Sequence, residues 1–367
     1  MSRQEKRVHW GSGPGRNTTN RDEAIYPDLI MFSGFGNVAV VITPEGLVVV
    51  DCSAVHIGPE IVRRIRARTE APFHTIIYTH GHMDHAGGVW AFMQDAEARQ
   101  HPRPKIIAQE RLPKRFDRYR ELGGHQLHMN RIQYGVQIDQ DHDEWKTLKF
   151  FRDDIPYPDI TYRDAMSFRL GGLTFELNHS LGETDDNTWV WIPERKTVVA
   201  GDAVKGGMPN IGNPFKVMLR YEVEWAEAME HIAGRKPEYL IPGHGPVMNA
   251  ETTREACLGQ ARFLRYVHDE VVRLLNQGCW LDEVLERVHV PDEILDQPYL
   301  RQVYGCLDFV IRGVYNRYAG WYNGRSSDLF PAGRSAVAAE VVSLGGARKL
   351  LDRVGALRDQ GLSLIHI

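Results

Sequence analysis

The stretch Thr79-His80-Gly81-His82-Met83-Asp84-His85 places four side chains that bind metals within six residues. It follows residues 73–78, a run rich in Ile and Tyr that predicts a buried strand. On a loop at a strand end, His80 and His82 are two residues apart and can point to the same side, while Asp84 and His85 can reach a second position nearby. The loop therefore predicts a centre for two metal ions.

The types of donor narrow the choice of metal. Imidazoles and a carboxylate suit zinc or a similar divalent ion, and one structural site rarely draws four ligands from so short a loop. The alternative is a chance cluster among 16 histidines in 367 residues. Such a spacing arises by accident in roughly one chain in several hundred, so the metal centre is the favoured interpretation.

Composition and charge exclude several classes of protein. A hydrophobic fraction of 43% and a charged fraction of 25% are typical of a soluble globular chain, and 367 residues allow one large domain plus a smaller one. The net charge is -4 and the basic residues are spread out, so no nucleic acid partner is expected. No run of about 18 apolar residues exists, so no membrane span is expected.

The cysteines and the N-terminus bear on location. Cys52, Cys257, Cys279 and Cys306 stand far apart with no Cys-x-x-Cys pair, which favours a reducing compartment or buried thiols over a disulfide framework. Residues 1–16 are polar and Gly-rich and lack an apolar core segment. We expect a cytoplasmic chain, unless a signal was trimmed from it.

Sheet-forming runs recur through both halves of residues 29–249, and residues 1–28 are expected to form an irregular arm on the surface. The expected strands are 29–32, 38–42, 47–50, 73–78, 105–108, 168–170, 173–177, 188–192, 197–200 and 239–241, and the expected helices between them are 59–69 and 89–99. This order predicts two packed sheets with helices outside. The basic, aromatic segment 111–140 is either a helical lid over the site or a solvated helical face.

Further polar groups follow predicted strands, where sheet proteins commonly place their chemistry. They are Asp51, the segment from His179 to Asn187, Gly201-Asp202, and Pro242-Gly243-His244-Gly245. Asp51 is expected either to orient a ligand histidine through a hydrogen bond or to serve as an ordinary turn or cap residue.

The order and spacing of these motifs resemble the metallo-β-lactamase superfamily. The motifs that match are His80-x-His82-x-Asp84-His85, a His-x-x-Gly-x-Thr segment, an isolated Gly-Asp at a strand end, and a Gly-His-Gly. The resemblance implies an α/β (α+β) fold, an αββα sandwich over about residues 29–249 that holds up to two divalent metals. One metal would take His80, His82 and the residue after Gly182; the other would take Asp84, His85 and His244, with Asp202 bridging. Asp84 and Asp202 would be its catalytic carboxylates.

One ligand position departs from the common form of the superfamily. Many members have His after the Gly, whereas this chain has Glu183, with His179 four residues earlier. Because a carboxylate is a valid zinc ligand, Glu183 is the expected ligand, and His179 is the second choice or a residue that orients a ligand. A Glu at this position resembles the alkyl sulfatase branch, although that branch has Glu at the bridging position, where this chain has Asp202.

The C-terminal third also resembles that branch. Residues 252–277, 281–288, 299–318 and 337 onward are helical by pattern, so residues 250–367 are expected to form an all-helical domain. Gly-Trp-Tyr-Asn-Gly at 320–324 and the segments 328–331 and 345–347 are similar to the dimerisation domain of alkyl sulfatases, which implies a homodimer. Typical members continue into a sterol-carrier-like domain, so a chain ending at Ile367 is expected to be a shortened or truncated member.

The resemblance implies a metal-dependent hydrolase of a small, anionic alkyl or aryl sulfate ester. Two adjacent divalent metals acidify a water between them, and the resulting hydroxide attacks the ester. Asn210 matches a family position that contacts sulfate, and Lys216 and Tyr134 lie in similar segments, where a surface lysine and a core tyrosine are the alternatives. Two other functions stay open: the same centre acting on phosphotriesters, phosphodiesters, lactones or β-lactams, and a non-catalytic zinc-binding dimer.

Overall fold

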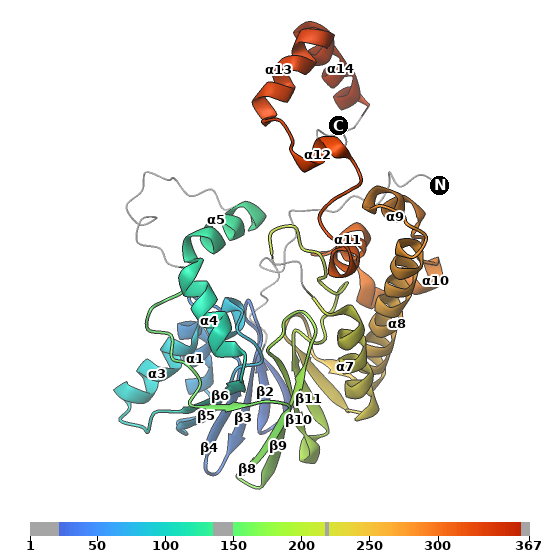
Figure 1. The fold of residues 1–367 in the computed structure, drawn as a ribbon. Coiled ribbons are helices and arrows are strands. Elements are labelled where there is room, and N and C mark those ends of the chain that lie inside the picture. Colours follow the sequence, from blue (N-terminus) through green and yellow to red (C-terminus); the bar gives the residue numbers. More distant parts are fainter. Residues whose placement is uncertain (1–21, 135–149, 217–219, 361–367) are drawn as a thin grey trace. The chain divides into compact units, whose positions relative to one another are not determined.

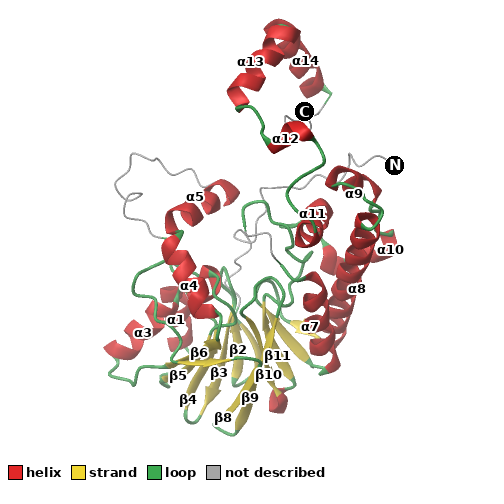
Figure 2. Ribbon diagram, viewed as in Figure 1, coloured by secondary structure: helices red, strands yellow, loops and turns green. Residues whose placement is uncertain are grey.

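The computed structural model describes residues 22–134, 150–216 and 220–360. The chain forms two compact units, Met1–Ala319 and Gly320–Ile367. The first unit has helices on both sides of two packed sheets (Figure 1, Figure 2). The α/β sandwich predicted from the sequence is therefore confirmed.

The first sheet has seven strands in sequence order. They are β1 (Glu23–Tyr26), β2 (Leu29–Phe32), β3 (Val38–Thr43), β4 (Gly46–Val50), β5 (Phe73–Ile77), β6 (Lys105–Gln109) and β7 (Ile160–Tyr162). Strands β1 to β4 pair antiparallel, and β4 to β7 pair parallel. Parallel neighbours need a long crossover, and α1 (Gly58–Arg66) and α3 (Val89–Ala98) supply it before β5 and β6.

The second sheet has the order β13-β12-β11-β10-β9-β8. Its strands are β8 (Ala165–Leu170), β9 (Leu173–Ser180), β10 (Asn187–Ile192), β11 (Thr197–Gly201), β12 (Tyr239–Pro242) and β13 (Met248–Asn249). Hairpins make β8 to β11 antiparallel, while β12 runs parallel to β11 after the crossover helix α7 (Glu222–Gly234). Strands β9, β11 and β12 thus all end at the same edge.

Alternation along the strands builds the core. On β3, Ala39 and Val41 pack between the sheets, while Val38 and Val40 face the outer helices. The inner layer meets Leu177 and Val190 of the second sheet, and all of these side chains are buried. The central strands β3, β4 and β10 are therefore apolar on both faces, which explains the nearly continuous hydrophobic runs in their sequences.

The helices that follow β13 belong to the first compact unit as far as Ala319. They are α8 (Ala250–Leu275), α9 (Leu281–Arg287), α10 (Asp292–Leu295), the short 3-10 helix η3 (Pro298–Leu300) and α11 (Leu307–Tyr318). Helix α8 packs along α7 around the fully buried Trp225. The second unit holds α12 (Ser326–Leu329), α13 (Arg334–Gly345) and α14 (Ala347–Asp359). The predicted domain boundary at residue 249 stays a prediction.

Two expectations for the elements were wrong. Residues 23–26, expected within an irregular arm, form β1, because they pair with β2 at the edge of the first sheet. The expected helix 299–318 is interrupted at residues 301–306, where a loop containing Gly305 separates η3 from α11. Segment 111–134 is helical as expected, in α4 (Leu112–Glu121) and α5 (Gly123–Tyr134), while residues 135–140 lie outside the described part.

No helix in the described residues is long and apolar enough to cross a membrane.

Helix α4 is anchored in the core by Leu112 and Phe116, both fully buried. Helix α5 leaves Ile132 half exposed. The two parts of the expected lid therefore differ in how firmly they are held.

The close approach of Gly212 to α11 gives a test of the packing. Gly212 has a φ of +71°, and a Cβ there would lie 1.8 Å from the carbonyl oxygen of Phe309. We expect Gly212→Ala to lower the free energy of unfolding by about 2–4 kcal/mol, because backbone strain adds to steric overlap. Gly172→Ala is the matched control, since Gly172 has a φ of +83° but open space around it, and should lose about 1–2 kcal/mol. Equal losses in chemical denaturation would contradict this account of the α11 contact.

Candidate metal centre

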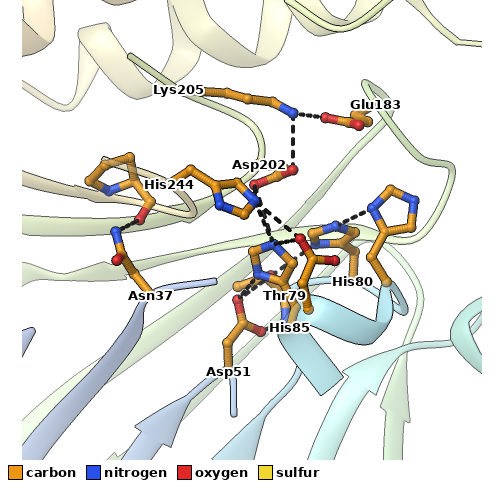
Figure 3. Close-up of polar contacts among 12 residues, drawn as sticks. Asn37, Asp51, Thr79, His80, His85, Glu183, Asp202, Lys205 and His244 are labelled. Atoms are coloured by element: carbon orange, nitrogen blue, oxygen red, sulfur yellow. Dashed lines mark hydrogen bonds and ion pairs between the residues drawn. The ribbon is translucent and has the colours of Figure 1, made fainter. Parts of the chain in front are cut away.

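Seven predicted side chains meet where strands of both sheets end (Figure 3). The β5–α2 loop and the short helix α2 (Met83–Ala86) supply four of them, and the other three follow β9, β11 and β12. The side chains are His80, His82, Asp84, His85, Glu183, Asp202 and His244. They form three overlapping groups of three residues. Within each group, the candidate ligand atoms lie within 4.8 Å of one another.

The imidazoles face one another through ring nitrogens. His80 Nε2 lies 2.9 Å from His82 Nδ1, and His85 Nε2 lies 3.3 Å from His244 Nε2. Two ring nitrogens at this distance repel through their lone pairs unless a proton or a metal lies between them. The arrangement suits a shared cation in each half of the centre.

Two carboxylates lie close to His85 and His244. Asp84 Oδ2 lies 3.3 Å from His244 Nε2, and Asp202 Oδ1 lies 3.4 Å from His85 Nε2. Asp202 Oδ1 is buried and makes no hydrogen bond. A buried carboxylate oxygen without a hydrogen bond is costly, so this atom is suited to coordinate a metal. The donor set of imidazoles and carboxylates fits zinc and similar divalent ions.

The protonation of the histidines differs between the two halves. Burial, together with the charge that a neighbouring imidazole would carry, lowers the pKa of His80 and of His82, so both rings are neutral at pH 7, the form that can coordinate a metal. Burial opposes charge on His85 and His244 as well, but Asp202 and Asp84 raise the pKa of both rings. A metal entering that half must therefore displace protons.

Asp51 forms hydrogen bonds with both ends of the loop that carries the first four candidate ligands, residues 79–85. It follows β4 with a φ of +64°, and its carboxylate accepts hydrogen bonds from the Thr79 backbone N–H and the Thr79 hydroxyl, each at 2.7 Å. Its Oδ2 also lies 2.7 Å from His85 Nδ1, which fixes that ring with Nε2 toward the centre. Thr79 Oγ1 in turn lies 3.1 Å from His80 Nδ1. Of the two roles expected for Asp51, the contacts are those of the orienting role.

The structure separates Glu183 from His179. Glu183 is buried and forms a group with His82 and Asp202. His179 lies on β9, where its Nε2 is 3.0 Å from the carbonyl oxygen of Asp185, and the candidate groups among the described residues do not include it. The contact of His179 is with the backbone of the loop that carries Glu183, which places it as a support for that loop.

Two cations at the centre were missed by sequence reasoning. Lys205 Nζ donates to Glu183 Oε2 and, at 3.0 Å, to Asp202 Oδ2, and Arg220 forms an ion pair with Glu183 Oε1 (Figure 3 shows Lys205). Burial favours the neutral form of Glu183, but Arg220 and Lys205 hold its pKa below its ordinary value. Lys205 is only three residues after Asp202, which was a usable signal. Arg220 lies outside the predicted strands and gave none.

A third cation joins two of the ligand loops. Asp186 is fully buried and accepts hydrogen bonds from the Gly81 backbone N–H at 2.9 Å and from Arg115 Nε at 3.0 Å. Arg115, on α4, also pairs with Asp185. This network fixes the loop of His80 and His82 against the loop of Glu183, so the ligand positions of the two sheets are held together.

The expected substrate residues have different surroundings. Asn210 is buried and donates from Nδ2 to Glu183 Oε1 at 3.0 Å, while its Oδ1 has no partner. Lys216 Nζ donates to Asn130 Oδ1 on α5 at 2.6 Å, and burial lowers the pKa of Lys216 to about 8. Tyr134 ends α5, and its side chain lies outside the described part of the structure.

Comparison with known proteins covers both regions of the chain. A family model described as the metallo-beta-lactamase superfamily matches residues 32–244, and one described as alkyl sulfatase dimerisation matches residues 281–363. A linear primary-alkylsulfatase of Pseudomonas sp. is 27% identical over 325 residues, which are 85% of this chain and 61% of the relative. The alkyl/aryl-sulfatase BDS1 of Saccharomyces cerevisiae is 26% identical over 302 residues, 78% of this chain and 47% of the relative.

Solved structures support the fold. The sec-alkylsulfatase Pisa1 from Pseudomonas sp., described as stereoselective and inverting, superposes with a TM-score of 0.78 at 22% identity. The match covers 92% of this chain and 56% of that chain. The chain thus spans less than two thirds of the length of the relatives it matches.

The placement of Glu183 and His179 gives a test of the ligand set. We expect Glu183→Gln to lose about one metal ion per chain, because the amide is a poorer ligand than the carboxylate at a group that includes His82 and Asp202. His179→Ala should keep full metal content, since its partner is a backbone carbonyl. Elemental analysis of metal-loaded, dialysed protein measures both. Loss of metal in His179→Ala alone would reverse the assignment.

Proposed function

Because the chain belongs to the metallo-beta-lactamase superfamily, we propose that it is a dinuclear metal-dependent hydrolase of alkyl or aryl sulfate esters. The observation that carries the proposal is the extent of the similarity. Alkylsulfatases of a bacterium and a yeast match 85% and 78% of this chain. The two family models match the region of the ligand loops and the helical segment described as alkyl sulfatase dimerisation.

Two divalent ions, zinc first among the candidates, fit the donor set described above. As the family resemblance implies, His80, His82 and Glu183 would hold one ion and Asp84, His85 and His244 the other, with Asp202 between them. In the structure Asp84, His85 and His244 form one candidate group, and Asp202 belongs to one group with His80 and His85 and to another with His82 and Glu183. The ions would supply Lewis acidity and an activated water at neutral pH. The chain itself contributes fixed ligand geometry through Asp51 and the network of Asp186.

An anionic substrate fits the positive side chains around the centre. Lys205, Arg220 and Arg115 are each less than one sixth exposed and lie at or beside the ligand loops. These three cations are paired with carboxylates, whereas the contact of Lys216 is the neutral amide of Asn130 on α5. The positive charge of Lys216 is therefore the most open to a sulfate group, and a fixed charge in a largely buried site lowers the free energy of a bound anion. In this proposal Lys216 supplies a charge, Asn210 an amide and Tyr134 a hydroxyl to the sulfate oxygens.

We propose a homodimer formed through the C-terminal helices. In the second compact unit, Val337, Val341 and Leu344 follow the spacing of one helical face on α13, and each is about half exposed or more. Val342, on another side of α13, is exposed as well, and exposed apolar side chains gathered on a small unit are typical of an interface. The match to the dimerisation family, over residues 281–363, makes a second copy of the chain the proposed partner.

The cytoplasm remains the proposed location. All four cysteines are free thiols in the structure. Three of them, Cys52, Cys257 and Cys279, are buried. Free thiols are the rule in reducing compartments.

A substrate panel tests the proposed activity. We expect metal-loaded protein to hydrolyse dodecyl sulfate or p-nitrophenyl sulfate, because the cations around the centre fit a sulfate monoester. Paraoxon, a phosphodiester, a lactone and a β-lactam provide the competing substrates, and Asp202→Ala provides an inactive control. Turnover confined to the non-sulfate compounds would overturn the sulfatase proposal. If a metal-loaded, dimeric protein turned over none of the compounds, the alternative of a non-catalytic zinc-binding dimer would be favoured.

The pKa of Lys216 gives a second prediction. Its folded-state pKa of about 8 means that the ammonium is present below pH 8 and lost above it. If this charge binds the sulfate, KM should rise roughly tenfold between pH 7 and pH 9, as the charged fraction falls. Lys216→Arg should keep KM low over this range because the guanidinium does not deprotonate. Lys216→Met should have a high KM with no such rise, and a wild-type pH profile in this variant would exclude the role.

A further inference from the structure

The two halves of the centre differ in the charges that surround their carboxylates. Asp84 contacts imidazoles, with His244 Nε2 at 3.3 Å and His85 Nε2 at 3.8 Å. An imidazole can give up its proton when a metal binds. Glu183 instead contacts Lys205 and Arg220, whose positive charges are permanent at neutral pH. A metal that binds Glu183 must therefore share its ligand with two fixed cations.

Lys205 has the more direct effect on this half. Its ammonium reaches both Glu183 Oε2 and Asp202 Oδ2, and these two carboxylates belong to one candidate group with His82. The ammonium thus occupies one oxygen of each of the two carboxylates in this group (Figure 3).

The fold holds Lys205 in this position. The carbonyl oxygen of Lys205 accepts a hydrogen bond of 2.7 Å from Gln260 Nε2 on α8, and Gln260 is fully buried. The same amide also donates to the carbonyl oxygens of Gly207 and Tyr299. The Lys205 side chain is 14% exposed, with its Nζ 5.9 Å from the centre of the Trp225 ring. The lysine is therefore built into the site and is not a mobile surface group.

We propose that Lys205 acts as a built-in counter-cation that makes the His80/His82/Glu183 position bind its metal more weakly than the Asp84/His85/His244 position. In the metal-free protein the ammonium keeps Glu183 and Asp202 together and offsets their repulsion. When a divalent ion enters, like charges in a buried site oppose each other and reduce its affinity. The two positions therefore fill in order, with the Asp84 position first. This inference rests on the proposed metal centre and deepens it.

Metal titration tests the proposal without measuring activity. Full-length, chelator-treated protein is titrated with Zn²⁺ in competition with a chromophoric chelator, and with Co²⁺ followed by its absorption spectrum. We expect wild-type protein to bind two ions with dissociation constants at least tenfold apart. Glu183→Gln should abolish the weaker class and His244→Ala the tighter one.

Charge removal at Lys205 gives the decisive comparison. Lys205→Met should strengthen the weaker class at least tenfold, while Lys205→Arg should keep the wild-type ratio. Lys196→Met is the matched control, because Lys196 pairs with Glu238 at 2.7 Å on the exposed surface and should leave the ratio unchanged. Circular dichroism checks that each variant is folded, and Lys205→Gln replaces the Met variant if that variant does not fold.

The outcomes separate this inference from the proposed function. Two wild-type sites of equal affinity, or a weaker class that is unchanged or weakened in Lys205→Met, would overturn the role of Lys205 while leaving the dinuclear hydrolase intact. Absence of any bound metal would overturn the metal centre and the hydrolase together. Failure to hydrolyse sulfate esters, with unequal sites that respond to Lys205, would overturn only the sulfatase proposal.

Discussion

The strands that carry the ligands end at one edge of two packed sheets, and the whole centre depends on this constraint. Parallel pairing brings the ends of β4 and β5 together, and the antiparallel hairpins before β11 give β9 the same direction as β11 and β12. Backbone hydrogen bonds then join the two sheets at this edge, from Asn37 to Gly243 at 2.8 Å and from Thr188 to Thr79 at 2.6 Å. Residues more than a hundred positions apart become neighbours as a result.

Charge is the second condition that the structure must satisfy. The centre buries the carboxylates of Glu183 and Asp202 and partly buries that of Asp84, and without compensation their repulsion and loss of hydration would destabilise the fold. Imidazoles offset part of this charge in the Asp84 half, and Lys205 and Arg220 offset it around Glu183. In the functions proposed above, the same cations would also attract an anionic substrate and weaken the binding of one metal. Stability, substrate preference and metal binding would then be linked through one set of side chains.

Much of the fold could be predicted because each strand is locally consistent. Strands β3 and β10 contain the continuous apolar runs 38–42 and 189–192, and both are buried central strands as the pattern indicates. The predictions were wrong where contacts with another segment determine the structure. Strand β1 forms because it pairs with β2. Its residues Glu23 and Ala24 are exposed, so its sequence has no clear hydrophobic pattern. The loop at 301–306 interrupts a sequence that is helical by pattern. The backbone N–H of Met208 donates a hydrogen bond of 3.1 Å to the carbonyl oxygen of Arg301 in this loop.

The sequence by itself determined the kinds of donor, their order along the chain and their positions at strand ends, because spacing of two within a loop and strand periodicity are local properties. His80, His82, Asp84 and His85 could be named as a group for that reason. Only the tertiary structure placed Glu183 in the centre and left His179 beside it, and only the tertiary structure brought Lys205 and Arg220 onto the Glu183 carboxylate. These are contacts between loops from separate strands, and their distances depend on how the sheets pair and pack, which no local pattern records.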